Sequence, residues 1–406
     1  MAITIITSPT DVSSANNPLI ITCSSDNVAN ANFKYIWQVY DGATLIATLK
    51  TSPRPDTYGL MNVQRIVENY VTSDFAIGEA TDGYECLNSY KDIEVAVGEE
   101  YGDPIVEYPA LGSAVTTILN AALKHSAASF GAEPDFIDAT LKSTYMMSNL
   151  VTGANKPFLT ASPRSVCLEF DQNYYLYALI NVGQEPAKLI LKYYDENDAL
   201  LSTATKTLTG TASEVVRYGV GTKNIKLWNA AYLVGAAWYT IQLATAGSVA
   251  ISELFTFRIG CECSKFNENF RLHFLNPLGG YDAHNFNKAY HRNLATARSS
   301  FQKVMGTVSN SGVFTYSIND RGKRNFNILT TETIKVNSDW LTEEEAEWMF
   351  SLVKSTDVLW EINATTFAPV TLTDVQYNAK SYAADGKLFN LELTIEIANQ
   401  ITSQRW

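Results

Sequence analysis

Apolar and polar side chains alternate with a period of two through much of the first hundred residues. Successive side chains of an extended strand point to opposite faces, so this alternation predicts half-buried β-strands. Asp41-Gly42 separates two of the segments and indicates a tight hairpin turn, because Asp and Gly tolerate the positive φ that such a turn requires. The expected strands are Leu19 to Cys23, Phe33 to Tyr40, Thr44 to Lys50 and Asp92 to Val97.

Three segments carry the three-to-four-residue spacing of amphipathic helices. The first is expected after Asn62, a residue type that caps helix amino termini. The second is expected over residues 113–130, followed by a connector through Asn155. The third begins after Thr342, where Glu345 completes a capping box and the acidic first turn suits the positive end of a helix. The apolar stripes are Val63, Ile66, Val67, Tyr70 and Val71 in the first helix, Val115, Ile118, Leu119, Ala122 and Leu123 in the second, and Ala346, Met349, Phe350 and Val353, expected to face a sheet, in the third.

Strand-like alternation resumes near Arg164 and continues to Arg258, with a polar turn at residues 195–198. The sequence therefore predicts a mainly β fold: two β-sandwich modules of immunoglobulin-like or fibronectin-like type and a C-terminal α+β module, with a few short helices. The later expected strands are Val166 to Phe170, Tyr174 to Ile180, Leu189 to Tyr194, Trp238 to Leu243, Leu254 to Phe257 and Leu388 to Ile397. The expected domains are an N-terminal sandwich with one inserted helix (1–111), a helical connector (112–156), a second sandwich (157–264) and an α+β assembly module (265–406).

Composition narrows the possible partners. The 406 residues carry a net charge of −12, which disfavours direct binding to a nucleic-acid backbone. Charged residues make up only 18% of the chain, so neighbouring subunits can cover its surface at little desolvation cost. The first residues show no secretory signal, and no apolar run approaches the length of a membrane span, so we expect a chain made in a cytoplasm without a membrane partner.

The five cysteines are expected to be mostly buried thiols, because their odd number and wide spacing do not suit a disulfide scaffold. Cys23, Trp37, Tyr84 and Cys86 nevertheless have the order of an immunoglobulin core, with a tyrosine corner two residues before the second cysteine. The absence of a visible secretory signal and the helical pattern between the cysteines argue against a true immunoglobulin domain. Whether Cys23 and Cys86 form a disulfide stays open. Cys261-x-Cys263 lacks further ligands at finger-like spacing, so no metal site is predicted.

Candidate catalytic groups have simpler structural interpretations. His273, His284 and His291 cluster near Asp282, but we expect His273 in a strand and His284 and His291 in a loop that packs through its side chains. The adjacent acids Glu99-Glu100 and Asp195-Glu196 point to different faces and form no catalytic dyad. Gly219-Val220-Gly221 lacks the third glycine and the helix of a phosphate loop. We expect no enzyme activity, no catalytic residues, no metal and no cofactor.

Aromatic residues make up 12% of the chain. They include the run Tyr174-Tyr175-Leu176-Tyr177, of which one face is expected to pack inward and the other to stay available to solvent or a partner. Tyr and Trp favour both protein interfaces and sugar-binding platforms, although core packing explains most of them.

The segment Phe274-Leu275-Asn276-Pro277-Leu278-Gly279-Gly280-Tyr281-Asp282 is an apolar strand that runs into a Pro/Gly turn and an acidic, aromatic loop. A second marker is Val97-Gly98-Glu99-Glu100-Tyr101-Gly102, preceded by Asn17-Pro18-Leu19-Ile20 and Phe33-Lys34-Tyr35. In this order, the segments resemble those of structural proteins from the tails and necks of bacteriophages that infect Bacteroidetes-type bacteria, including the crAss-like group. The resemblance spans most of the chain.

The resemblance implies a non-enzymatic virion protein that repeats around a symmetric tail, neck ring or baseplate. Its partners would be copies of itself and other phage tail or neck proteins. The alternative is a receptor-binding or carbohydrate-binding module at a tail tip, with host surface glycan as the partner. A tail-associated glycan hydrolase lacks an identifiable acid pair. The expected interaction residues are Leu275, Asn276, Gly279, Gly280, Tyr281, Asp282 and Phe286.

Overall fold

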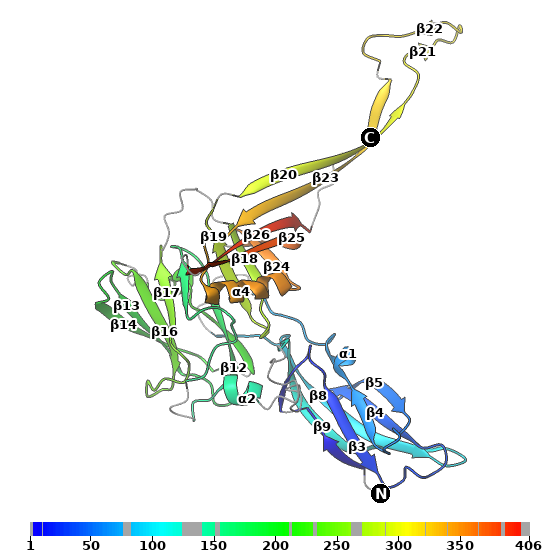
Figure 1. Ribbon diagram of the computed structural model, residues 1–406, viewed down its shortest axis with the longest axis vertical. Helices are drawn as coiled ribbons and strands as arrows, with labels where there is room; N and C mark the ends of the chain where they lie inside the picture. The colour runs from blue at the N-terminus through cyan, green and yellow to red at the C-terminus, as the bar shows by residue number, and fades with distance from the viewer. Residues whose placement is uncertain are drawn as a thin grey trace. The chain divides into compact units, whose positions relative to one another are not determined.

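The computed structural model describes residues 3–9, 11–75, 83–123, 140–150, 155–210, 213–229, 234–260, 270–288, 290–320, 322–338, 340–363, 365–382 and 386–398 (Figure 1). The chain divides into two compact units. Unit 1 comprises residues 1–263, 274–283 and 350–356, and unit 2 comprises residues 264–273, 284–349 and 357–406. The fold is mainly β with short helices, as the alternation predicted.

The N-terminal part of unit 1 is a sandwich of a three-stranded sheet, in the order β1-β3-β6, and a five-stranded sheet, in the order β2-β9-β8-β4-β5. Its core holds Cys23, Tyr35, Trp37 and apolar residues that alternate along the strands, such as Val95 and Val97. The strands are β1 (Ile3–Thr7), β2 (Val12–Ser14), β3 (Ile20–Ser25), β4 (Lys34–Asp41), β5 (Thr44–Thr51), β6 (Gly59–Asn62), β8 (Tyr90–Tyr101) and β9 (Val106–Leu119).

One local signal in this sandwich is confirmed, and a second is confirmed only in part. Asp41 pairs with Thr44 at the end of the β4–β5 hairpin, and Gly42 takes a φ of +56°. The expected helix after Asn62 is only the single turn α1 (Gln64–Val67), with Val63 rather than Asn62 at the N-cap position, and Tyr70 of the expected stripe lies beyond it and is exposed. The Asn62 carboxamide oxygen accepts hydrogen bonds from the backbone N–H groups of Gln64 (3.1 Å) and Leu19 (3.0 Å).

The expected helix over residues 113–130 is wrong for its first part, because β9 is a strand through Leu119. Val115, Ile118 and Leu119 fit a helical stripe, but β9 pairs antiparallel with β8 along almost its whole length. Ladder hydrogen bonds to an adjacent strand therefore override the local pattern. Residues 124–139 lie outside the described residues. The helix α2 (Thr140–Tyr145) follows them.

A second sandwich follows in unit 1, from a four-stranded sheet in the order β10-β12-β15-β7 and a five-stranded sheet in the order β11-β17-β16-β13-β14. The alternating side chains of β13, Leu189, Leu191 and Tyr193, enter its core. The elements are β7 (Gly83–Glu85), β10 (Met146–Met147), β11 (Ser165–Leu168), β12 (Tyr175–Ile180), β13 (Lys188–Tyr194), β14 (Leu200–Thr207), β15 (Val215–Gly219), α3 (Thr222–Lys226), β16 (Trp238–Ala244) and β17 (Phe255–Ile259).

The run of aromatic residues before and in β12 is buried on both faces. Tyr174 and Leu176 belong to the sandwich core, as the inward set was expected to. Tyr177 is also buried, and its hydroxyl donates a 3.1 Å hydrogen bond to the Asp74 carbonyl. The expectation that the second face stays available is wrong for Tyr177, because other segments of unit 1 cover it.

The C-terminal sheet has seven strands in the order β19-β18-β24-β25-β26-β23-β20, and the helix α4 (Glu343–Lys354) lies between β23 and β24 in the chain. The capping box is confirmed: the Glu345 N–H donates to Thr342 Oγ1 (3.3 Å), and the Thr342 N–H donates to Glu345 Oε2 (2.9 Å). Ala346 and Met349 are buried as expected, but Phe350 is exposed, because the buried stripe continues through Leu352. The strands are β18 (Phe270–Leu275), β19 (Tyr281–Phe286), β20 (His291–Gln302), β23 (Lys323–Asn337), β24 (Val358–Asn363), β25 (Thr366–Tyr382) and β26 (Gly386–Ile397). No helix of the described residues is long and apolar enough to cross a bilayer.

Candidate functional site

Two hairpins follow one another in the chain and differ in burial: the strands of the first are mostly buried, and the first strand of the second is exposed throughout. The first, called the marker hairpin below, consists of β18, the turn at residues 276–280 and β19. The second, called the arm, comprises residues 291–337: the strands β20 and β23 and, at the distal end, the short strands β21 (Thr307–Val308) and β22 (Phe314–Thr315).

Asn276 organises the turn of the marker hairpin. Its backbone N–H donates to the Gly280 carbonyl (2.8 Å), and its side-chain oxygen accepts from the N–H groups of Leu278 (2.9 Å) and Gly280 (3.2 Å). Its side-chain nitrogen donates to the Leu159 carbonyl (3.0 Å) and to Asp282 Oδ1 (3.0 Å). Asn276 therefore holds the turn closed and ties it to a segment more than a hundred residues away.

Asp282 is 2% exposed and also has partners within unit 1. Its Oδ1 accepts a 2.6 Å hydrogen bond from the Thr160 hydroxyl, and its Oδ2 accepts from the Ala161 N–H at 3.3 Å. A buried carboxylate is costly unless it is hydrogen-bonded in this way. Asp282 therefore serves as a fixed acceptor for the segment around Thr160.

The two turn glycines permit close backbone approach. Gly279 has a φ of +86°, and a Cβ there would lie 2.3 Å from the Asn120 carbonyl oxygen. A Cβ on Gly280 would lie 2.7 Å from the Leu159 carbonyl oxygen and 3.0 Å from the Tyr177 ring. Glycine is needed at both positions because any larger residue would collide with backbone atoms of the same unit.

The structure places the seven predicted interaction residues close together in the hairpin. Six of them are buried within the chain, and Leu275 is half-buried. Their contacts described here are to the chain itself, which accounts for the motif without a second subunit. A contact with a partner at these residues stays a prediction.

The second marker is also held inside its own module. Glu99 is fully buried and accepts hydrogen bonds from the Ser25 hydroxyl (2.5 Å) and the Asn27 side chain (2.7 Å). Glu100 accepts from Lys50 Nζ at 2.5 Å, and this cation is the main reason that the pKa of Glu100 is lowered. The two carboxylates have separate partners, as expected of neighbours on a strand.

The immunoglobulin interpretation of the cysteine pattern is wrong. Cys23 and Trp37 belong to the N-terminal core, but Cys86 donates its N–H to the Val215 carbonyl of the second sandwich. Tyr84 lies on β7 beside β15, with its ring 5.4 Å from the Arg217 guanidinium carbon. The spacing of the four residues in the sequence cannot reveal that β7 pairs with β15 of the second sandwich.

Cys23 and Cys86 are free thiols, and burial raises the pKa of each to about 12. These two cysteines are buried thiols as expected, whereas Cys167 in β11 is disulfide-bonded, against the expectation. Cys261 and Cys263 lie outside the described residues. The described residues contain no group of three or more His, Cys, Asp or Glu side chains that could hold a metal ion.

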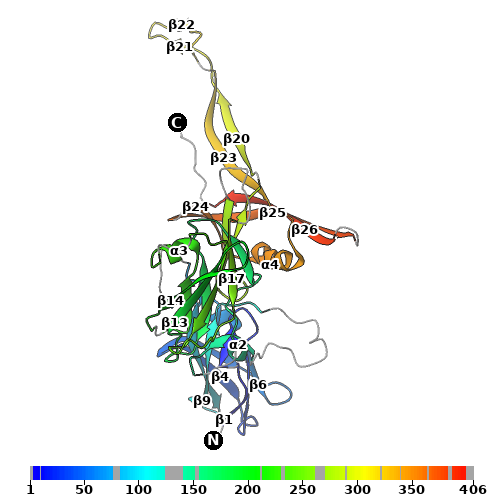
Figure 2. The ribbon, with the colours of Figure 1, turned by 90° about the vertical axis from the view of Figure 1, so that its left-hand side faces the viewer.

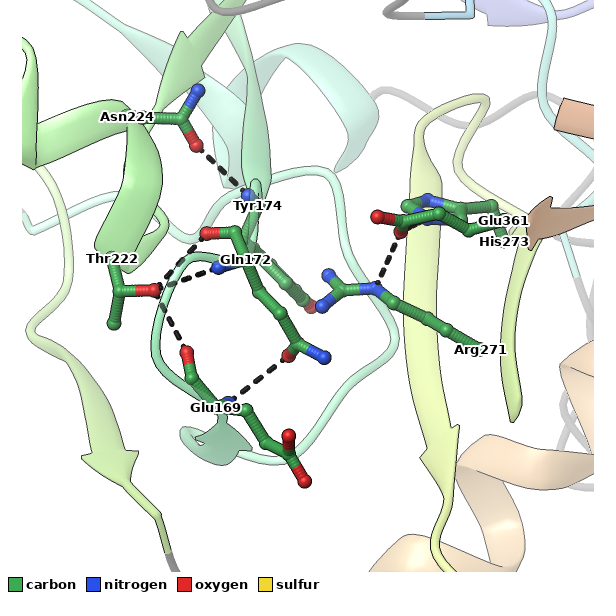
Figure 3. Close-up of polar contacts among 8 residues, drawn as sticks. All are labelled: Glu169, Gln172, Tyr174, Thr222, Asn224, Arg271, His273 and Glu361. Carbon is green, nitrogen blue, oxygen red and sulfur yellow. Dashed lines mark hydrogen bonds and ion pairs between the residues drawn. The ribbon is translucent and has the colours of Figure 1, made fainter. Parts of the chain in front are cut away.

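The predicted cluster of histidines is divided among different environments. His273 Nε2 lies 2.7 Å from Glu361 Oε2, and Arg271 Nε lies 3.2 Å from the same oxygen (Figure 3). His284 belongs to β19 rather than a loop, with its ring edge-on to Phe286 and to Trp348. Burial is the main cause that lowers the pKa of both, to about 4 for His284.

The Gly-x-Gly segment also serves the fold. Thr222 Oγ1 donates to the Glu169 carbonyl (2.8 Å) and accepts from the Gln172 N–H (3.0 Å), and Asn224 Oδ1 accepts from the Tyr174 N–H (2.9 Å) (Figure 3). A Cβ on Gly221 would lie 2.3 Å from the Tyr174 nitrogen. The segment therefore clamps the turn that precedes β12. The expectation that no helix follows it is wrong, because the short helix α3 begins at Thr222, directly after Gly221.

The arm has the opposite character. Figures 1 and 2 show β20 and β23 running out from the rest of unit 2 as a two-stranded ribbon, with β21 and β22 at its end. All twelve residues of β20 are exposed. Among the residues that the structure describes, only the base of β23 has a second neighbour, β26, which pairs with residues 333–337. At about 3.3 Å per residue, β20 alone spans roughly 40 Å.

The distal part of the arm exposes apolar side chains. Ile318 is 99% exposed, Val304 78% and Tyr316 74%. An isolated two-stranded hairpin is at best marginally stable in water, and exposed apolar patches mark interaction sites. The further exposed apolar residues of the arm are Leu294, Phe301, Met305, Val308, Val313, Phe314, Phe326 and Leu329.

Sequence reasoning missed the arm, although one signal was present. The segment 291–302, His-Arg-Asn-Leu-Ala-Thr-Ala-Arg-Ser-Ser-Phe-Gln, has no apolar face, and residues 291–337 contain seven Lys and Arg against two Asp and Glu. A basic stretch without an apolar stripe in an acidic chain indicates a segment that does not pack on its own core.

The architecture defines a mainly β protein with two sandwich modules and an α+β part. No protein-family model matches the chain, and no curated protein matches it. Among solved structures, one similar chain comes from the tail of an empty GTA particle with C6 symmetry. It is 13% identical, the match covers 29% of the present chain and 81% of that chain, and the TM-score is 0.17. A likeness of this size carries no weight for the fold or the function of the present chain.

Proposed function

We propose that this chain is a non-enzymatic structural subunit of a bacteriophage virion, repeated around a symmetric tail, neck ring or baseplate. The single observation that carries the proposal is the arm, a long ribbon whose strand β20 is exposed along its full length and whose distal apolar side chains, such as Ile318 and Val304, are largely exposed. The sequence markers and their resemblance to phage tail and neck proteins supply the virion context. The subunit would be made in the host cytoplasm and would act by assembly with copies of itself and other tail or neck proteins.

Rigid sandwich modules suit such a role. Both sandwich cores are filled by large side chains that are almost completely buried, including Trp37, Tyr239 and Phe257. Interiors packed at this density deform little, so they hold an attached hairpin at a fixed position.

The alternative is a receptor-binding or carbohydrate-binding module. Sugar platforms need aromatic rings gathered on one surface. The exposed Tyr58, Tyr70, Tyr84 and Trp340 lie in separate parts of the chain. The exposed rings of the arm form two pairs, Phe301 with Phe326 and Phe314 with Tyr316. Self-assembly accounts better for exposed apolar residues that are concentrated in one arm.

Electron microscopy of the purified chain over a range of concentrations tests the proposal. We expect concentration-dependent rings or tubes, with the mass of the particles confirmed by light scattering. A chain that stays monomeric up to millimolar concentration would contradict the proposal, and glycan binding by that monomer would favour the alternative.

A further inference from the structure

The charge of the chain is divided unevenly along its length. The arm, residues 291–337, has seven basic and two acidic residues, a net charge of +5, so the rest of the chain carries −17. Residues 1–111 contain five Lys and Arg and fifteen Asp and Glu, a net charge of −10. The chain therefore joins a basic arm to an acidic N-terminal sandwich.

This distribution of charge favours one of two possible contacts between copies of the chain, arm with arm or arm with N-terminal sandwich. Two arms placed side by side would bring like charges together, which costs free energy and slows encounter. An arm placed on the N-terminal sandwich of another copy would bring opposite charges together. Electrostatic complementarity therefore favours contact between arm and sandwich over contact between two arms.

The N-terminal sandwich exposes an acidic and apolar surface that matches the arm. The turn between β8 and β9 carries Asp103 and Ile105, and β9 begins with Val106 and Glu107, all exposed. Glu107 Oε1 also lies 2.5 Å from Lys50 Nζ of its own chain, so Asp103 is the carboxylate of this surface that we assign to the contact. Farther along β9, Leu111 is 38% and Val115 62% exposed. We call Asp103, Ile105, Val106, Glu107, Leu111 and Val115 the β9 surface.

The strand edge at this surface is also open. In the described residues, β2 pairs with β9 only at residues 117–119, so residues 106–116 form the edge of their sheet. Edge strands with exposed apolar side chains are sites where another chain can pack or pair. The β9 surface thus offers apolar contact, negative charge and an open edge together.

We propose that the arm of one copy binds the β9 surface of a second copy. The proposal rests on the proposed function and adds the two surfaces that meet and their order. Each copy then carries one arm and one receiving surface, so the contact is heterologous. Contacts of this kind close into a ring or continue as a tube, whereas a contact between two identical arms would stop at a dimer.

A pair of complementary variants tests the order of contact. In the first, residues 295–331 are replaced by Asn-Gly. Leu294 and Glu332, which flank the replacement, are register partners in the β20–β23 ladder, so a two-residue turn can join them. The base of β23 keeps its pairing with β26. In the second, Val106 and Val115, both exposed, are changed to Asn. Circular dichroism and thermal melting check that both variants fold.

We expect each variant alone to be a monomer by light scattering. Mixed together they should form a species of two chains that grows no further, because only the arm of the second variant and the β9 surface of the first remain available. If the second variant assembles by itself, and the mixture forms no species of two chains, then the arms contact one another and the inference is overturned. Assembly of both variants like the wild type would overturn it as well, while the proposed function stands. A wild-type chain that never assembles would overturn both.

Charge reversal tests the electrostatic part. Arg298→Glu with Lys323→Glu, both exposed on the arm, should weaken assembly about tenfold or more at low salt. Asp103→Lys on the other surface should restore part of the loss when it is combined with the reversed arm in one chain. Arg298→Gln with Lys323→Gln is the control for loss of charge without reversal and should have an intermediate effect. Equal assembly of wild type and reversed arm, or no recovery in the combined variant, would overturn the charge complementarity.

Discussion

The marker hairpin and the arm show two uses of the same structural element. In the marker hairpin, Asn276 and Asp282 have partners in unit 1. The two turn glycines lie against the backbone carbonyl groups of Asn120 and Leu159. In the arm, β20 is exposed along its full length and the tip is apolar. The first hairpin stabilises its own chain, and the second leaves its surface exposed.

The difference teaches which kind of signal marks an interface. The marker hairpin has the more distinctive sequence, with Pro, Gly, Asn and Asp at positions that fix a turn. Such residues are required wherever backbone must approach backbone, so a distinctive turn indicates tight packing within the chain. The arm has no distinctive sequence motif, and the role proposed for it rests on its exposure and charge.

The largest difference in stability between the two hairpins is expected when a methyl group is added to each at a glycine with positive φ. Gly279→Ala would place Cβ 2.3 Å from the Asn120 carbonyl oxygen and should lower the free energy of unfolding by about 3 kcal/mol or more. Gly312 in the arm has a φ of +76° with open space around it, so Gly312→Ala should lower it only by about 1 kcal/mol. Urea unfolding measures both. Equal losses would show that the backbone conformation, and not the contact with Asn120, is what matters.

Gly280→Val tests the other turn glycine of the marker hairpin. A Cβ at Gly280 meets the Leu159 carbonyl oxygen at 2.7 Å, so the isolated chain itself should be destabilised. Thermal melting of the isolated variant shows this directly, and an unchanged melting temperature would contradict the close packing of this turn within unit 1.

The next effect concerns acid. Burial lowers the pKa of His284 in β19 to about 4, whereas an unfolded histidine has a pKa near 6.5. The unfolded chain therefore binds the proton first, and stability that is complete above about pH 6.5 is lost as the pH falls toward 4, by at most about 3 kcal/mol. His284→Asn should flatten this part of the profile of stability against pH. His291→Asn, at the exposed start of the arm, should leave the profile as it is in the wild type. If neither substitution alters the profile, His284 is not the cause of the loss of stability in acid.

A smaller effect is expected from acidic side chains. Asp282→Ala removes the acceptor of Thr160 and Asn276, and buried groups left without a partner cost about 1 to 3 kcal/mol. Asp320→Ala in the arm removes an acceptor for the Ser317 N–H, which water can replace, so the change should stay within about 0.5 kcal/mol. Chemical denaturation measures the free energy of unfolding of both variants. A larger loss for Asp320→Ala than for Asp282→Ala would contradict the contrast between the hairpins.

The smallest effect on stability is expected at the tip of the arm. Ile318→Ser should change the free energy of unfolding by less than about 0.5 kcal/mol, because the side chain is 99% exposed. The same change should weaken assembly, since it removes apolar area from the proposed contact. Light scattering of wild type and variant at matched concentrations gives the second number. Normal assembly with normal stability would remove the tip from the contact.

Much of the fold could be predicted from local patterns. Strands β3, β4, β5, β12, β13, β16 and β26 follow from alternation, and α4 follows from its capping box, because these signals lie within one element. The helix expected at residues 113–130 failed where Val115, Ile118 and Leu119 fit a helical stripe but pair with β8. The immunoglobulin pattern failed because β7 pairs with a strand more than a hundred residues later. Such long-range choices depend on which edge a strand meets, and no local pattern encodes that.

The candidate site was predicted only in part. The marker turn was found, and its glycines do allow close approach, but the approach is within unit 1. The arm could not be found by searching for amphipathic periodicity, since a strand with two exposed faces has none. Its excess of Lys and Arg was visible in the sequence, but that excess becomes informative only when the exposure of β20 and the acidic N-terminal sandwich are seen with it.

Hydrogen exchange measured by mass spectrometry, on dispersed and assembled chain, tests the central contrast most directly. Amides of the turn at residues 276–280 should be protected to the same degree in both states, because their partners are within the chain. Amides of residues 295–331 should exchange rapidly in the dispersed chain and become protected on assembly. An arm that exchanges equally fast in both states, with protection gained instead at the marker turn, would contradict the account.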